Sequence, residues 1–414
     1  MNTTSSSSSR RVFLGTMLAA GAASAPALRA APATGGLPAT RMAAREIKLG
    51  LIGCGSRGLN VIAKLFQAHG GFTFHSVADY FEPVAVQAGG QLGVDRSRCF
   101  AGLSGYRRLL DSGVEAVAIL DVPCFYPEQA RAAVDAGVHV YLAKPVAVDV
   151  PGTLLIGECG RRATQRQRCF LVDYQIPGDP AIGEVADRVR AGALGRIAHI
   201  TSFGFGWRAW PDPPRGPTIA DRLRRSIWLS DTALGGDTIV SYDIHIIDGV
   251  IAVTGQRPSA ACGRSRTCRP QPQGDRTDVA AVIYEQDDGV LWTHVTQALN
   301  NNFDLANLSA SILGTQATAH LGYKGKAYVR GGERHYVGEI SPALGREGPA
   351  RNIAEFYRSI TEGRFENPTV QRAVDGHLTA ILGREAAARR CYLTMEELLR
   401  ENRRLPVDVS GLKV

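Results

Sequence analysis

The sequence lacks the marks of a nucleic-acid-binding protein and of an integral membrane protein. Its 414 residues contain no run of five or more lysines and arginines, although the formal net charge is +8. Scattered basic residues of this kind usually form a solvated surface, so no nucleic-acid partner is expected. No stretch beyond the first 31 residues is apolar enough to cross a bilayer, which takes about 20 apolar residues. We therefore expect no stable membrane insertion of the remaining chain.

The sequence also lacks the cysteine patterns of metal and redox sites. Its eight cysteines include no Cys-x-x-Cys pair and show no metal-binding spacing with histidine, so no metal ion is expected. Buried free thiols are the simplest interpretation of Cys54, Cys124 and Cys169. Cys262 and Cys268 could instead form a disulfide in an oxidising compartment.

A twin arginine is the first positive feature of the chain. Arg10-Arg11 precedes an apolar run that ends near Ala23 and is followed by small residues and prolines. The run is about 12 residues long, too short to span a bilayer. This pattern predicts a signal for twin-arginine (Tat) export, which carries folded proteins to the periplasm. We assign residues 1–31 to the signal peptide and 32–45 to a linker; a disordered tail with a chance arginine pair is the alternative.

The remaining part of the chain has roughly 380 residues. Chains of this length usually form more than one hydrophobic core, so two domains are expected. Over residues 46–178, short apolar runs alternate with segments of helical spacing. Strands separated by helices indicate an α/β fold with a parallel, doubly wound Rossmann sheet. The expected strands cover residues 47–52, 72–78, 114–120, 138–142 and 169–174, and the clearest helices cover 59–69 and 128–136.

A glycine-rich turn after the first expected strand indicates dinucleotide binding. Gly53 permits the tight turn, Gly55 lets the backbone approach a pyrophosphate, and Gly58 lets the next helix pack on the strand. Ser56 and Arg57 lie where the amides of the helix start would face the phosphates.

An acidic residue at the end of the second expected strand refines the cofactor prediction. Asp79 lies where a carboxylate can accept both hydroxyls of the adenosine ribose. Because it would repel a 2′-phosphate, NAD is favoured over NADP. Arg57 could pair with that phosphate and keeps NADP open.

Several further motifs make the chain resemble the Gfo/Idh/MocA oxidoreductases, which include glucose–fructose oxidoreductase and inositol dehydrogenase. The resemblance extends over nearly all of the chain after the signal. It rests on the glycine turn, Ala136–Tyr141, Lys144-Pro145, Ala191–Ile197, Gly235-Gly236-Asp237, Asp243–Asp248, Asn367-Pro368 and Gly383–Ala386.

The resemblance implies a second, α+β domain with a large, mainly antiparallel open sheet. We assign residues 179–350 to this domain and 351–414 to C-terminal helices that pack back on the Rossmann domain. Residues 197–205, 279–285, 290–297 and 308–314 have strand-like composition, and Asp287-Asp288-Gly289 is typical of a hairpin turn. In this family the outer face of the sheet often forms the oligomer contact, so a homodimer or homotetramer is expected.

The resemblance also implies the catalytic residues. The family motif Glu-Lys-Pro reads Ala143-Lys144-Pro145 here, and its lysine would reach both the nicotinamide and the reacting oxygen. The family motif Asp-x-Gly-x-His starts with Ser241 here and ends with His245, which would act as the base. Asp243 would share a face with His245 on a strand but not on a helix. Whether it replaces the missing carboxylate is open at this stage.

Other residues are expected to complete the site. Pro123, beyond the strand expected at 114–120, is assigned to the coenzyme. Gln175 matches a family glutamine, and with Tyr174 and Tyr242 it is assigned to the substrate. Trp228 belongs to a tryptophan-containing insert, residues 206–236, where an aromatic ring could stack on a sugar or simply pack the loop.

These features together predict an exported NAD(P)-dependent oxidoreductase that transfers hydride between nicotinamide and a sugar, sugar acid, cyclitol or glycoside. The periplasm supplies no free NAD, so a tightly retained coenzyme is expected. One alternative is net glycoside cleavage by oxidation, elimination and re-reduction. The other is a non-catalytic ligand-binding or sensor protein, which the altered positions Ala143 and Ser241 leave open.

Overall fold

A computed structural model describes residues 45–207, 212–299 and 308–414. The signal peptide and the linker up to residue 44 lie outside the described residues, so their assignments stay predictions. In the described ranges, no helix combines the length and the apolarity that a membrane span requires. All eight cysteines lie in these ranges as free thiols, and Cys262 and Cys268 are not joined in a disulfide.

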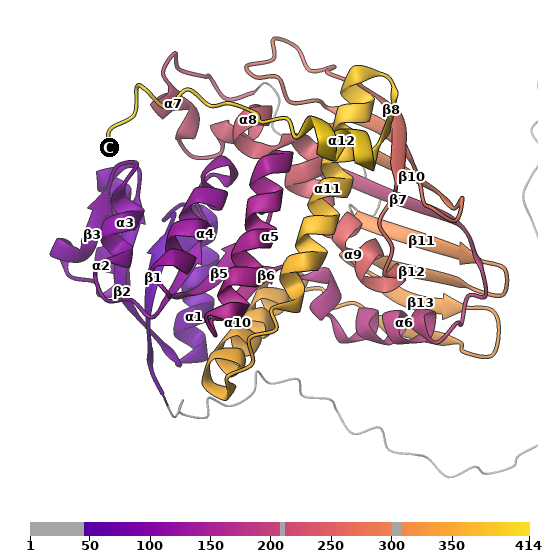
Figure 1. The fold of residues 1–414 in the computed structure, drawn as a ribbon, viewed down its shortest axis with the longest axis horizontal. Coiled ribbons are helices and arrows are strands. Elements are labelled where there is room, and N and C mark those ends of the chain that lie inside the picture. The colour runs from indigo at the N-terminus through magenta and orange to yellow at the C-terminus, as the bar shows by residue number, and fades with distance from the viewer. Residues whose placement is uncertain (1–44, 208–211, 300–307) are drawn as a thin grey trace, which may run out of the picture. The chain divides into compact units, whose positions relative to one another are not determined.

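The first sheet contains six parallel strands in the order β3-β2-β1-β4-β5-β6, which confirms the predicted Rossmann fold (Figure 1). Strands β4, β5 and β6 are mostly apolar because every residue in them is buried. The strands are β1 (Ile47–Ile52), β2 (Phe72–Asp79), β3 (Cys99–Ala101), β4 (Ala116–Ile119), β5 (His139–Ala143) and β6 (Phe170–Asp173).

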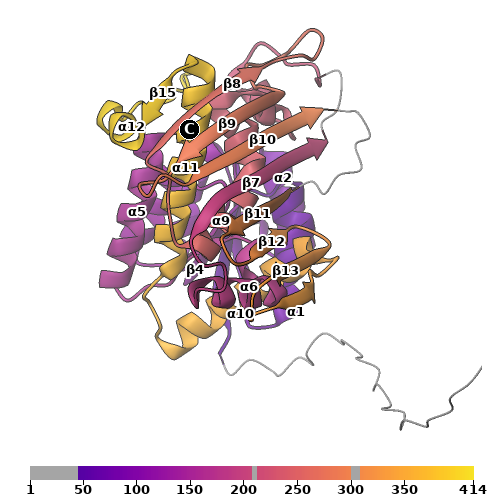
Figure 2. The same ribbon diagram turned by 90° about the vertical axis from the view of Figure 1, so that its right-hand side faces the viewer.

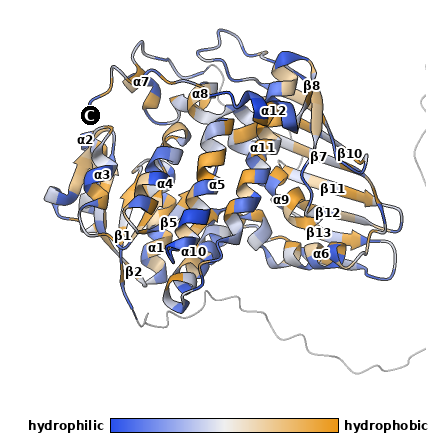
Figure 3. Ribbon diagram, in the orientation of Figure 1, coloured by the Kyte–Doolittle hydropathy of each residue, from blue (hydrophilic) through white to orange (hydrophobic). Residues whose placement is uncertain are grey.

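Helices cover both faces of this sheet, and their outer turns carry most of the hydrophilic residues (Figure 3). Helix α4 packs between α3 and α5, whereas α1 packs against α10. The helical segments up to the sixth strand are η1 (Gly58–Ala63), α1 (Lys64–His69), α2 (Glu82–Leu92), η2 (Arg96–Arg98), α3 (Gly105–Leu110), η3 (Pro123–Phe125), α4 (Tyr126–Asp135) and α5 (Val150–Gln165).

The second sheet contains nine strands in the order β14-β13-β12-β11-β7-β10-β9-β8-β15. Strands β7 and β10 run parallel, and the other neighbouring pairs run antiparallel, so the predicted α+β architecture is confirmed. The strands are β7 (Ile197–Trp207), β8 (Ala260–Arg266), β9 (Val279–Glu285), β10 (Leu291–Leu299), β11 (Leu308–Gly314), β12 (Thr318–Gly322), β13 (Lys326–Arg330), β14 (Tyr336–Glu339) and β15 (Tyr392–Thr394).

Helices α6, α9 and α11 lie on one face of the second sheet, and its other face is open (Figure 2). Helix α11 also packs against α5 and β6 of the first domain, so it contacts both domains. The helical segments of this part are η4 (Ile176–Gly178), α6 (Pro180–Arg190), α7 (Ile219–Leu223), η5 (Ile227–Ser230), α8 (Thr232–Gly235), η6 (Ile239–Asp243), α9 (Ile244–Thr254), α10 (Leu344–Glu362), α11 (Pro368–Arg389) and α12 (Met395–Glu401).

The carboxyl ends of the parallel strands form the edge on which the site is built. The glycine turn follows β1, Asp79 ends β2, Asp121 follows β4 and Lys144 follows β5. Strand order reverses between β1 and β4, the position at which sheets of this type bind ligands.

Candidate functional site

The glycine turn has the shape that a pyrophosphate requires. Gly53 has a φ of +85°, and a Cβ there would lie 2.4 Å from the Asp121 nitrogen. A Cβ on Gly58 would lie 2.2 Å from the Gly53 oxygen, because helix and strand approach closely. A Cβ on Gly55 would meet no atom within 4 Å, so the space beside this residue is open. The turn therefore fits the phosphates of a dinucleotide at the helix start, beside Ser56 and Arg57.

Two backbone amides hold Asp79, one from the glycine turn and one from the segment just after its own strand. Its Oδ2 accepts a hydrogen bond from the Cys54 nitrogen at 2.9 Å, and its Oδ1 accepts one from the Phe81 nitrogen at 2.9 Å. Burial raises the pKa of this carboxyl above its ordinary value, and the two backbone hydrogen bonds oppose that shift. Each carboxylate oxygen has further lone pairs, so Asp79 can also accept ribose hydroxyls.

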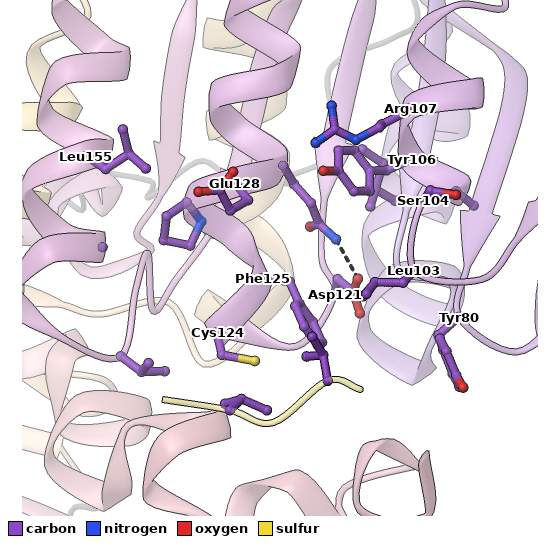
Figure 4. A pocket seen from close by; sticks show the side chains of 18 of the residues that line it. Tyr80, Leu103, Ser104, Tyr106, Arg107, Asp121, Cys124, Phe125, Glu128 and Leu155 are labelled. Carbon is purple, nitrogen blue, oxygen red and sulfur yellow. Dashed lines mark hydrogen bonds between the residues drawn. The ribbon is translucent and has the colours of Figure 1, made fainter. Parts of the chain in front are cut away.

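A pocket of about 560 Å³ opens beside Asp79 (Figure 4). Asp121 lines it together with Tyr80, Leu103 and Phe125. Its position at the ends of β2 and β4 is that of the adenosine in a Rossmann fold. Pro123 is buried in the first position of η3, next to this pocket rather than in its lining.

Asp121 is a second carboxylate in this pocket that the sequence analysis did not single out. Its Oδ2 accepts a hydrogen bond from Gln129 Nε2 at 2.6 Å, and its Oδ1 accepts one from the Val122 nitrogen at 2.8 Å. Burial, together with the charge of Asp79, raises its pKa to about 6. The same signal that identified Asp79, an acidic residue directly after an apolar strand, was present at Asp121.

The second half of the site lies where the first sheet meets α9. Lys144 follows β5, and its Nζ donates a hydrogen bond to the Ser241 carbonyl oxygen at 2.7 Å. Ser241 belongs to η6, which leads directly into α9 and His245. The structure thus brings Lys144 and the Ser241–His245 segment together although about 100 residues separate them.

His245 lies in the first turn of α9 between two tyrosine rings. Its ring centroid is 5.3 Å from that of Tyr323 and 6.5 Å from that of Tyr174. Burial lowers its pKa well below the ordinary value, and the positive charges of Lys144 and Arg57 add to the shift. Its Nδ1 is buried and has no hydrogen-bond partner within the described ranges. The ring is therefore neutral near pH 7 and able to accept a proton.

Asp243 and His245 do not share a face, because the segment is helical. The Asp243 side chain instead turns to the second sheet, where its Oδ2 lies 3.0 Å from His294 Nε2. The Nδ1 of His294 hydrogen-bonds Ser202 Oγ at 2.7 Å, and Ser202 Oγ also accepts from Trp292 Nε1. A Cβ on Gly204 would lie 1.9 Å from Asp243 Oδ1, so this strand position must be glycine. The structure places Asp243 in a buried polar chain rather than beside His245.

The four residues assigned to the substrate do not all lie on the His245 side of the site. The Oε1 of Gln175 accepts from the Tyr323 hydroxyl at 3.2 Å, on the His245 side of the site. Tyr174 is buried, with its hydroxyl 3.1 Å from His377 Nδ1. The hydroxyl of Tyr242 lies 3.4 Å from the Phe205 oxygen. Trp228 packs in an apolar cluster with Val122 and Leu223, at the adenosine end and away from His245.

A buried carboxylate links the glycine turn to this half of the site. Asp173 ends β6, and its Oδ2 lies 3.5 Å from the Arg57 guanidinium. Its Oδ1 accepts a hydrogen bond from Asn352 Nδ2 at 2.8 Å. Arg57 is also close enough to His245 for its charge to contribute to the lowered pKa of that ring. Tyr323 and Asn352 come from distant segments of the chain, and no sequence motif marks either of them.

Comparison with known proteins agrees with this geometry. Residues 182–320 match the family model described as the GFO/IDH/MocA C-terminal domain. An inositol 2-dehydrogenase of Acidothermus cellulolyticus is 23% identical over 358 residues, which cover 83% of this chain and 92% of that protein.

Two solved structures share the fold. The inositol dehydrogenase homolog of Azotobacter vinelandii complexed with NAD+ has a TM-score of 0.70 at 18% identity, over 86% of this chain and 98% of that one. The aldose-aldose oxidoreductase of Caulobacter crescentus complexed with glycerol has a TM-score of 0.68 at 16% identity, over 84% of this chain and 100% of that one.

Proposed function

The chain belongs to the Gfo/Idh/MocA oxidoreductases, and on that premise we propose that it transfers hydride between NAD and a CH–OH group of a sugar or cyclitol. The observation that carries the proposal is the convergence of Lys144 and a neutral His245 beside a turn shaped for a dinucleotide. The inositol dehydrogenase activity of one relative and the NAD+ bound to one structural neighbour support it.

The coenzyme would be held by the groups at the carboxyl edge of the first sheet. The glycine turn would receive the pyrophosphate, and Asp79 would accept the adenosine ribose hydroxyls. The acidic character of this pocket disfavours a 2′-phosphate, so NAD is the proposed coenzyme. When bound, the coenzyme supplies the acceptor for the hydride.

Two side chains of the protein would transfer the proton and stabilise the charge on the reacting oxygen. His245 takes the hydroxyl proton while the C–H bond breaks with its electron pair and a carbonyl forms. The Lys144 ammonium donates a hydrogen bond to the same oxygen and stabilises the negative charge that develops there. Burial, supported by the charge of Lys144, keeps His245 neutral before the reaction, because both lower the pKa of the ring. In reduction the same groups act in reverse.

The proposal is tested by assaying purified protein with NAD+ against a panel of sugars, sugar acids, cyclitols and glycosides, with NADH formation as the readout. Mass spectrometry of the denatured protein would show whether coenzyme remains bound after purification. Turnover of one substrate class supports the oxidoreductase. Bound NAD without turnover of any compound would favour the ligand-binding alternative, and glycoside cleavage without net NADH would favour the elimination route.

We further propose that the protein is exported by the twin-arginine route with its coenzyme already bound. The Arg10-Arg11 pair and the short apolar run after it support this route. Replacing both arginines with lysine should leave precursor in the cytoplasm, whereas the unaltered protein should be recovered from the periplasm after cleavage between about residues 25 and 31. Undiminished export of the lysine variant would contradict the proposal.

A homo-oligomer is also proposed, in which the open face of the second sheet forms the contact. Apolar side chains on that sheet remain partly exposed, among them Phe203, Ile283, Leu291 and Val295. Light scattering on the purified protein would determine the oligomeric state, and a monomer would contradict this assignment.

A further inference from the structure

The last thirteen residues of the chain, 402–414, form an extended segment that we call the C-terminal tail. After α12 the tail crosses the carboxyl edge of the parallel sheet and ends near β3 and α3 (Figure 1). Apart from a short turn at residues 410–412, it contains no helix or strand. A segment of this kind has few backbone hydrogen bonds of its own and must be held in place by contacts with the rest of the chain.

Both ends of the tail are fixed to the Rossmann domain. At its start, the Leu405 nitrogen donates a hydrogen bond to Asp149 Oδ2 at 2.9 Å. At its end, the Lys413 oxygen accepts from the Leu103 nitrogen at 2.8 Å, and the Lys413 nitrogen donates to the Tyr80 hydroxyl at 3.3 Å. These contacts join the tail to both sides of the pocket beside Asp79.

A buried leucine provides the apolar anchor of the tail. Leu412 retains 7% of its exposure and packs in a cluster with Val122, Leu223 and Leu234. Tyr80, Leu103 and Phe125 pack against the same cluster, and all three also line the pocket. Displacing Leu412 would therefore disturb the pocket wall and the tail together.

Between its anchors, the tail itself lines the pocket. Leu405, Pro406, Val407 and Val409 contribute to the same cavity as Asp79 and Asp121. The tail passes close to Cys124 and Phe125 on the side opposite the sheet (Figure 4). An adenosine in this pocket would lie between the strand ends and the tail.

We propose that the C-terminal tail is the outer wall of the adenosine site and slows the release of bound NAD. The inference rests on the proposed function, because it assigns the pocket to the adenosine of the coenzyme. Detachment of the tail from Leu103, Tyr80 and the Leu412 cluster would open this half of the site further and so speed the release of coenzyme. The tail thus provides a physical means of keeping the coenzyme in place through successive turnovers.

Dissociation kinetics test the proposal directly. The purified full chain is loaded with NADH and mixed with an excess of NAD+, and the loss of bound-NADH fluorescence gives the dissociation rate. The test variants are a chain that ends at Asn402 and the point variant Leu412→Asp. The matched control is Ser410→Asp, which places the same charge on an exposed tail position outside the pocket.

We expect both test variants to release NADH roughly 10- to 100-fold faster than the unaltered protein, as loss of one buried leucine anchor implies. Ser410→Asp should release it at the unaltered rate. Equal rates for all four proteins would overturn the proposal, and so would faster release from Ser410→Asp alone. Leu412→Ala replaces Leu412→Asp if thermal unfolding shows that the latter does not fold.

The same experiment separates this proposal from the proposed function. If the unaltered protein binds neither NADH nor NAD+, the assignment of the coenzyme fails and the tail proposal fails with it. If the unaltered protein binds NADH and the shortened chain releases it equally slowly, only the tail proposal fails.

Discussion

The two ends of the site differ in charge and in how they are assembled. The adenosine end contains the carboxylates Asp79 and Asp121, which lie at the carboxyl ends of β2 and β4, on either side of β1 in one sheet. The reactive end combines the cation Lys144 and the Arg57–Asp173 ion pair with the neutral ring of His245, which a helix beside the second sheet supplies. The comparison indicates that one end is suited to holding hydroxyl groups and the other to moving a proton.

The difference also appears in the direction of the pKa shifts. At the adenosine end, burial raises the pKa of Asp79, and burial together with the charge of Asp79 raises the pKa of Asp121. At the reactive end, burial and neighbouring cations lower the pKa of His245. Both shifts favour the uncharged form of the group, but only at His245 does that form create a base. Substitutions at each end should therefore affect different measurements.

The largest effect is expected from Lys144→Ala. Removing the ammonium group takes away charge stabilisation of the reacting oxygen, so kcat should fall by roughly 10²–10⁴-fold or more. Bound coenzyme, quantified after denaturation, should decrease far less than turnover. Lys144→Arg keeps the charge but not the geometry and should recover only part of the rate. An unchanged kcat in Lys144→Ala would remove this residue from the mechanism.

His245→Ala should lower kcat by a similar or somewhat smaller factor, roughly 10²–10⁴-fold, because the base is lost. In the unaltered protein, the fall of kcat/KM for oxidation on the acid side should lie below pH 6.5, since the pKa of His245 is lowered from that value. Asp243→Asn is the matched control in the same segment. Because Asp243 contacts His294 instead, it should change kcat by only a few-fold. A large loss would make Asp243 the substitute for the missing carboxylate.

Asp79→Ala should act on coenzyme affinity and leave the chemistry of bound substrate intact. Loss of charged hydrogen bonds to the ribose weakens binding by about 1.5–3 kcal/mol, or roughly 10- to 150-fold in Kd. The difference between NAD and NADP should narrow, because repulsion of the 2′-phosphate is also lost. Titrating both coenzymes into both proteins measures these effects. Tighter binding of NADP by the unaltered protein would show that Asp79 does not select the coenzyme.

The smallest effect on turnover is expected from Asp121→Asn, whose main effect should be on stability. Between pH 3.8 and about 6, the folded carboxyl holds a proton that the unfolded one has lost, so stability falls as pH rises through this window. The asparagine should therefore raise the free energy of unfolding at pH 8 by up to about 3 kcal/mol and change little below pH 4. The buried Gln129 Oε1, which has no partner within the described ranges, can accept from the new amide. Denaturant unfolding at both pH values checks this; equal effects at the two would contradict it.

Much of the fold could be predicted because its signals are local. The apolar run before Gly53 became β1, the segment before Asp79 became β2, and the Asp287-Asp288-Gly289 turn joins β9 to β10. Each follows from neighbouring residues that must bury apolar side chains or adopt a positive φ. Strands β14 and β15 were not predicted, because such short segments are stabilised by their sheet neighbours rather than by a pattern of their own.

The sequence by itself was enough to predict the dinucleotide-binding turn and the carboxylate at Asp79. It was also enough to identify Lys144 and His245 as candidate catalytic residues. Only the tertiary structure decided which groups meet. In the folded chain Asp243 contacts His294, and Tyr323 lies beside His245. The C-terminal tail lines the pocket assigned to the adenosine. The physical reason is that a sequence motif reflects interactions among residues that are close together in the chain. Contacts between the two sheets depend on how α9 and α11 pack, which no local pattern specifies.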